Sequence, residues 1–154
     1  MAKSKKVIGI DPGKNTGIAI KDLEDDKLIF MSTMMIHQAF DLIKDELDDS
    51  YILVEDAHLW NDKSAKNYHA RAQGAGSIKR DCTIWKDFLE DHGAFFDMPR
   101  PMSKKIKDIK HKEFARLTGW TGRTNEHNRV AGMMVFGYNK NYVNILYREK
   151  IASI

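Results

Sequence analysis

The sequence predicts an α/β fold in which a mixed β-sheet carries helices on both of its faces. Three features support this prediction: short apolar runs joined by turns at the start of the chain, alternating strand and helix patterns afterwards, and one later run that is apolar throughout. The length of 154 residues suits one domain with a single core, and 42% apolar against 31% charged residues is the composition of a globular protein.

The first three strands are predicted at 6–10, 16–20 and 28–31, where short apolar runs are separated by polar turns. The first run ends at Asp11, which is followed by proline and glycine, a strong turn signal. Strands joined by such short turns pair with one another in antiparallel fashion. We therefore expect an antiparallel meander of three strands.

The middle of the chain alternates between helical and strand patterns. Apolar residues at helical spacing predict a helix over 36–47, and the apolar run at 51–55 predicts a fourth strand that is covered on both faces. Because a helix precedes this strand, we expect it to run parallel to one of the first three. A helix is predicted over 62–92, interrupted at a Gly-Ala-Gly sequence, and a fifth strand at 94–97.

Two further helices are predicted in the last third of the chain, at 110–117 and at 125–138, with a turn-rich loop between them. No role is predicted for the apolar patch at 142–147. The sequence shows no internal repeat and no linker, so we expect a single domain over 1–154 with its core at about 6–138.

Several classes of protein are excluded by composition. No run approaches the ~20 apolar residues that a membrane span needs, and the basic start of the chain lacks the apolar segment of a signal peptide. The single cysteine, Cys82, excludes an intrachain disulfide framework and a cysteine-rich zinc site. We expect a cytoplasmic protein without a membrane partner.

The charges are segregated along the chain although the net charge is only +3. Residues 41–49 carry a local charge of −4, whereas residues 100–112 carry +5. The basic side chains of this second segment, called the basic segment below, are Arg100, Lys104, Lys105, Lys107, Lys110 and Lys112. Such a segment predicts a positive face that binds nucleic acid, with a solvated helix face as the alternative.

Two carboxylates come at the ends of predicted neighbouring strands. Asp11 closes the first strand and Glu55 closes the fourth. Taken singly, Asp11 is typical of a turn and Glu55 of the first exposed residue after a strand. Taken together, they form a pair of oxygen ligands of the kind that Mg²⁺ prefers. Glu126 and His127, in the first turn of the last predicted helix, could complete the ligand set, although alone they are typical of an ordinary helix start.

Four motifs resemble those of RuvC-type Holliday junction resolvases, which have a ribonuclease H-like fold. The sequence Val-Ile-Gly-Ile-Asp-Pro-Gly at 7–13, with Thr-Gly at 16–17, resembles the opening motif, and Leu-Val-Glu at 53–55 resembles the second. Residues 70–76 resemble the helix that bears a Gly-Ala-Gly sequence, and Asn-Glu-His at 125–127 is similar to the last motif, especially in the short bacteriophage members. The combination spans about residues 6–138.

The resemblance implies a homodimer that binds four-way DNA junctions and nicks two strands symmetrically with two Mg²⁺ or Mn²⁺ ions per active site. By position, Asp11 and Glu55 are metal ligands, and His127 matches the ligand that opens the last motif. Glu126 is a further candidate ligand. A carboxylate pair with two ions about 4 Å apart activates a water and stabilises the leaving oxygen in phosphodiester cleavage.

The resemblance also gives the basic segment a role, since the family carries lysines there that contact phosphates near the scissile bond. We favour Lys112 and Lys105 for this contact, and Lys112 as a catalytic residue. Trp60 is a candidate for stacking on an opened base, with burial as an equal alternative. Arg71, in the Gly-Ala-Gly helix, is a further candidate for DNA binding.

One position departs from the family pattern. The family has an aspartate three residues after the ligand that opens the last motif, and this chain has Val130. Three alternatives follow: Glu126 supplies the missing acid, or the remaining residues hold one ion tightly and a second loosely, or the protein binds junctions without cutting them. A more remote alternative is a nucleotide-binding fragment of the actin-like kind, which would bind ATP.

Overall fold

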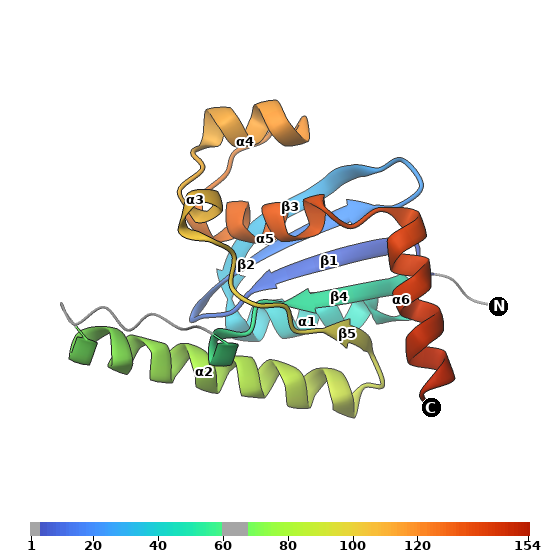
Figure 1. The fold of residues 1–154 in the computed structure, drawn as a ribbon, viewed down its shortest axis with the longest axis horizontal. Coiled ribbons are helices and arrows are strands. Elements are labelled where there is room, and N and C mark those ends of the chain that lie inside the picture. Colours follow the sequence, from blue (N-terminus) through green and yellow to red (C-terminus); the bar gives the residue numbers. More distant parts are fainter. Residues whose placement is uncertain (1–3, 60–67) are drawn as a thin grey trace.

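In the computed structural model, which describes residues 4–59 and 68–154, five strands form one sheet in the order β3-β2-β1-β4-β5 (Figure 1). The strands are β1 (Lys6–Asp11), β2 (Asn15–Asp22), β3 (Lys27–Met35), β4 (Ser50–Val54) and β5 (Phe95–Asp97). The first three pair antiparallel, β4 runs parallel to β1, and β5 runs parallel to β4. The predicted mixed sheet with an antiparallel start is confirmed.

Helices cover both faces of this sheet, also as predicted. On one face, α1 (Ile36–Glu46) and α2 (Tyr68–Asp91) enclose a core that includes Trp85, which is fully buried. On the other face, α5 (Glu126–Phe136) and α6 (Lys140–Ala152) enclose a second core (Figure 1). The strands between the two cores are apolar on both sides, which explains the continuous apolar run of β4.

Short helices occupy the connections. The 3₁₀ helices η1 (Leu47–Asp49) and η2 (Ala57–Leu59) flank β4, and α3 (Lys104–Lys107) and α4 (His111–Thr118) follow β5. The basic segment is thus divided between α3, the first turn of α4 and the turns around them. No described helix is long and apolar enough to cross a membrane.

The structure differs from the sequence prediction at several elements, among them the short helix α3, where no helix is predicted, and three others. β3 continues to Met35 because it pairs with β2 along the full length of that strand, as far as Asn15. α2 runs through the Gly-Ala-Gly sequence without the predicted interruption, since a helix tolerates isolated glycines at a modest cost. α6 was not predicted, and its Val143 is fully buried in the second core, which therefore extends beyond residue 138.

Helix α5 packs closely against the sheet because two of the facing strand positions are glycine. A Cβ atom added at Gly17 in β2 would come within 2.9 Å of the Asn128 nitrogen and closer still to the carbonyl of His127. A Cβ atom at Gly9 in β1 would overlap the carbonyl of Ala131 in the same way. Only hydrogen fits at these two positions, and the first turn of α5 is therefore fixed at the end of β1.

Candidate active site

The register of the sheet places the two predicted carboxylates side by side. Ile10 of β1 is the partner of Val54 of β4, and the next backbone N–H, that of Glu55, donates a hydrogen bond to the Ile10 carbonyl (3.1 Å). Asp11 and Glu55 therefore leave the same edge of the sheet from neighbouring parallel strands. Because side chains alternate along a strand, both carboxylates point to the face that α5 covers.

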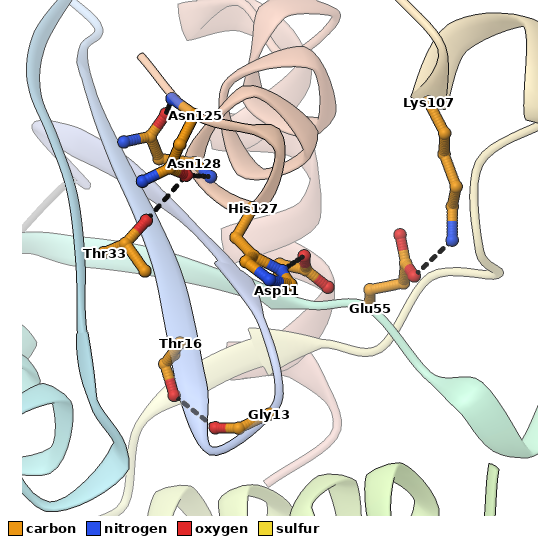
Figure 2. Close-up of polar contacts among 9 residues, drawn as sticks. All are labelled: Asp11, Gly13, Thr16, Thr33, Glu55, Lys107, Asn125, His127 and Asn128. Atoms are coloured by element: carbon orange, nitrogen blue, oxygen red, sulfur yellow. Dashed lines mark hydrogen bonds and ion pairs between the residues drawn. The ribbon is translucent and has the colours of Figure 1, made fainter. Parts of the chain in front are cut away.

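A capping box presents the third part of the site. The Asn125 side chain accepts a hydrogen bond from the Asn128 N–H (3.0 Å), and the Asn128 side chain accepts one from the Asn125 N–H (2.9 Å). The Thr33 hydroxyl of β3 donates to Oδ1 of Asn125 (2.8 Å), which ties this cap to the sheet (Figure 2). The first helical residues, Glu126 and His127, are thereby held at the sheet edge.

His127 lies against Asp11. Its Nδ1 is 3.3 Å from Oδ2 of Asp11, and Figure 2 shows the ring beside the carboxylate. The hydrogen bond to Asp11 raises the pKa of His127, the charges of Asp11 and Glu126 add to this effect, and partial burial opposes it. The first strand and the last motif thus meet in one contact.

Glu55 is buried but only half satisfied. The residue is 6% exposed, and its Oε1 accepts a hydrogen bond from Lys107 Nζ (2.9 Å; Figure 2). Its Oε2 is buried without a hydrogen-bond partner among the described residues. Burial raises the pKa of Glu55 and the nearby charge of Asp11 raises it further, whereas Lys107 and, more weakly, the backbone of Met102 oppose both. The surroundings of Glu55 therefore favour an additional positive charge.

A pocket of about 210 Å³ joins these groups. It is lined by Asp11, Pro12, Glu55, Ala57, Ile78, Pro101, Lys107, Glu126, His127 and Val130. All four predicted metal ligands therefore line one pocket, together with a lysine of the basic segment. Val130 is 6% exposed and forms part of the wall, at the position where the family pattern has its aspartate.

The other members of the basic segment lie elsewhere on the surface. In the described structure, these exposed side chains do not line the pocket: Arg100, Lys104, Lys105, Lys110 and Lys112. Lys104 pairs with Asp108 (2.9 Å), and Lys112 lies in the first turn of α4. Lys107 is the lysine that lines the pocket, whereas Lys112 and Lys105, which the resemblance favours for the phosphate contact, do not line it. Spacing along the chain could not reveal this, because every lysine of the run has the same local signal.

Two predicted DNA contacts cannot be placed. Trp60 lies outside the described residues. Arg71 lies in the first turns of α2, and its side chain is also outside what the structure describes. Further along α2, Cys82, Trp85 and Leu89 are fully buried, whereas Ile78 is 37% exposed and lines the pocket.

The donor set fits a divalent cation of the Mg²⁺ or Mn²⁺ kind. Carboxylate oxygens from Asp11, Glu55 and Glu126 with a nitrogen from His127 are suitable ligands, and the buried, unpartnered Oε2 of Glu55 lacks a positive group. Within residues 4–59 and 68–154, no three such side chains already form a cluster that could hold an ion. Instead, Asp11 is paired with His127, and Glu55 with Lys107.

Comparison with known proteins identifies the fold. No protein-family model matches the chain, and no curated protein matches it. Among solved structures, RuvC of T. thermophilus in complex with a Holliday junction substrate is similar, with a TM-score of 0.57 over 94% of this chain and 96% of that chain. The identity is 13%, so the likeness is one of fold. The predicted ribonuclease H-like fold is confirmed.

Proposed function

We propose that this protein is a DNA endonuclease that depends on divalent metal ions and resolves four-way or otherwise branched DNA junctions. One observation carries the proposal: Asp11, Glu55, Glu126 and His127 line a single pocket with Lys107, at the edge of a RuvC-like sheet. The solved RuvC structure contains a Holliday junction substrate, and we propose the same class of substrate for this protein on that basis.

The pocket residues divide the work of phosphodiester hydrolysis. Asp11 and Glu55 would hold the metal, His127 would add a nitrogen ligand, and Glu126 would supply the acid that Val130 does not; all five residues line the pocket. Two bound Mg²⁺ or Mn²⁺ ions would activate the attacking water and stabilise the leaving oxygen. Attack in line with the leaving group leaves 5′-phosphate and 3′-hydroxyl ends. Lys107, at the pocket wall, stabilises the negative charge that develops on the phosphate.

We assign binding of the junction to the basic segment, and recognition of its two-fold symmetry to a homodimer. Lysine and arginine side chains around α3 and α4 neutralise DNA phosphates, so affinity falls steeply with salt. Lys112, Lys105, Trp60 and Arg71 remain predicted DNA contacts. A junction is nearly two-fold symmetric, so a homodimer would place one pocket on each of two strands and make paired nicks. We place this activity in the cytoplasm of a bacterium, as a cellular or a bacteriophage protein.

The proposal is tested with labelled four-way junctions incubated with the protein and Mg²⁺ or Mn²⁺. We expect paired, symmetric nicks that Asp11→Asn abolishes. Asp41→Asn is the matched control, because Asp41 is an exposed aspartate on α1. Equal cleavage by wild type and Asp11→Asn would overturn the proposal.

A second candidate is a junction-binding protein that does not cut, and two observations favour it. Val130 places an apolar wall where the family has an acid, and Lys107 already neutralises one oxygen of Glu55. Tight junction binding without any nick would support this candidate. Val130→Asp separates the two further, since a rise in cleavage would identify the position as a vacated ligand site.

A further inference from the structure

The ion pair between Glu55 and Lys107 links two distant parts of the chain at the pocket. The partners are 52 residues apart in sequence, one directly after β4 and the other at the end of α3. Their side chains differ in exposure, 8% for Glu55 and 36% for Lys107. The carboxylate is therefore fixed in the protein, whereas the ammonium group has access to solvent.

Lys107 only partly compensates the charge of this pocket. It donates to one oxygen of Glu55, and the other oxygen is buried without a partner among the described residues. The charge of Asp11 adds to the negative potential at Glu55. Lys107 contacts only Glu55, and Asp11 is paired instead with the ring of His127, so a divalent cation that contacts both carboxylates would compensate them better than Lys107 does.

The chain on either side of α3 is anchored close to the pocket. Before α3, the Pro99 carbonyl accepts a hydrogen bond from the Asp56 N–H (2.9 Å). After α3, the Ile109 carbonyl accepts one from Nε of Arg129 on α5 (3.2 Å). Lys107 can thus release Glu55 by rotating its flexible side chain while its backbone stays at the pocket. After its release, the ammonium group of Lys107 would still be able to reach a phosphate that is bound at the pocket.

We propose that Lys107 is an internal cation that occupies Glu55 in the metal-free protein and that a divalent ion displaces it. This inference rests on the proposed function, since it assumes the metal site at Asp11 and Glu55. The exchange couples two ligands: the ion frees Lys107 for a DNA phosphate, and a phosphate that binds Lys107 frees Glu55 for the ion. By linkage, each ligand raises the affinity for the other by the same factor.

The test measures Mn²⁺ affinity of the full chain by calorimetry in the absence of DNA. Lys107→Met should bind Mn²⁺ about tenfold more tightly than wild type, because no ammonium competes for Glu55. Lys107→Arg retains a cation and should restore the weak binding. Lys140→Met is the matched control, since it removes the same charge and a lysine–glutamate pair (2.7 Å to Glu24), and its Mn²⁺ affinity should equal that of wild type.

A second readout follows the lysine itself. In NMR spectra of protein with ¹³C-methylated lysines, Mg²⁺ should shift the resonance that is missing from Lys107→Arg. An unshifted resonance at saturating Mg²⁺ would overturn the displacement, even if Lys107→Met does not fold.

The outcomes separate this inference from the proposed function. Equal Mn²⁺ affinity in wild type and Lys107→Met, with binding lost in Glu55→Gln, would refute the displacement and leave the metal site intact. Absence of Mn²⁺ binding in both proteins would refute the metal site, and with it both proposals.

Discussion

Two charged side chains are buried to nearly the same degree and differ in how they are satisfied. Lys21 in β2 is 5% exposed, and Glu55 after β4 is 6% exposed. Lys21 Nζ donates to the carbonyls of Phe136 (3.2 Å) and Tyr138 (2.9 Å), at the C-terminal end of α5, and pairs with Asp26 (2.9 Å). Each of its three protons thus has a partner.

Glu55 lacks such a complete set. One of its oxygens binds Lys107, and the other is buried without a partner among the described residues. The difference shows what each group contributes: Lys21 stabilises the end of a helix, whereas Glu55 is available for a ligand. Helix α5 lies between Lys21 and Glu55. Lys21 binds the C-terminal end of α5, and the first turn of α5 forms part of the pocket beside Glu55.

The largest expected effect is on cleavage. Glu55→Gln should reduce junction cleavage by more than about 100-fold, because loss of a ligand costs more than loss of the groups that orient one. Its free energy of unfolding at pH 7 should be unchanged or higher, because the substitution removes a buried negative charge. Gel assays of cleavage and urea unfolding of the same preparation measure both. A variant that cleaves normally would contradict our assignment of Glu55.

For Lys21→Met we expect the reverse of the Glu55→Gln result, namely a loss of stability with the metal site retained. Two helix-end carbonyls would lose a charged donor, and we expect the free energy of unfolding to fall by about 2–3 kcal/mol. Urea unfolding followed by circular dichroism measures the loss. Mn²⁺ affinity of the folded fraction should be retained. A stability equal to wild type would show that the burial of Lys21 does not stabilise α5.

A smaller effect is expected where α5 contacts the sheet. Gly17→Ala places a methyl group against the backbone of His127 and should lower the free energy of unfolding by about 1–3 kcal/mol. Gly76→Ala is its control, because a Cβ atom there meets nothing within 4 Å, and in a helix interior it should raise stability by about 0.5–1 kcal/mol. Thermal unfolding compares the two variants. A destabilised Gly76→Ala protein would contradict the placement of Gly76 in a helix interior with open space around it.

The smallest effect is a pH dependence. The pKa of Glu55 is raised in the folded protein, so between its unfolded and folded values the native state binds more protons than the unfolded state. Stability from this group is therefore present at acid pH and is lost as pH rises through the folded pKa. Urea unfolding from pH 4 to pH 8 should show that wild type loses stability relative to Glu55→Gln. The opposite slope would mean that Lys107 compensates Glu55 fully.

The sequence was sufficient for the parts of the fold that repeat a simple pattern. The strands at 6–10 and 51–55 carry continuous apolar runs, and the structure confirms them within one residue at each end. α6 was missed because its apolar residues alternate with asparagine, lysine and arginine, and only Val143 is fully buried. Its stability depends on tertiary contacts such as the ring pair of Phe95 and Tyr147, which local sequence does not encode.

The candidate site was predictable to a similar extent. Asp11, Glu55 and His127 stand at ends of elements, where position alone determines the neighbourhood. The choice among lysines was not predictable, because it depends on how α3 turns between the anchors at Pro99 and Ile109. Whether Val130 weakens the site depends on the free energy of metal binding, which the spacing of residues along the sequence does not determine.

The central claim is that Asp11 and Glu55 share a divalent ion. Anomalous diffraction from crystals soaked in Mn²⁺ tests it most directly. We predict a manganese peak within coordination distance of a carboxylate oxygen from each residue, with Lys107 turned away from Glu55. A peak bound to neither carboxylate, or no peak at saturating Mn²⁺, would contradict the account.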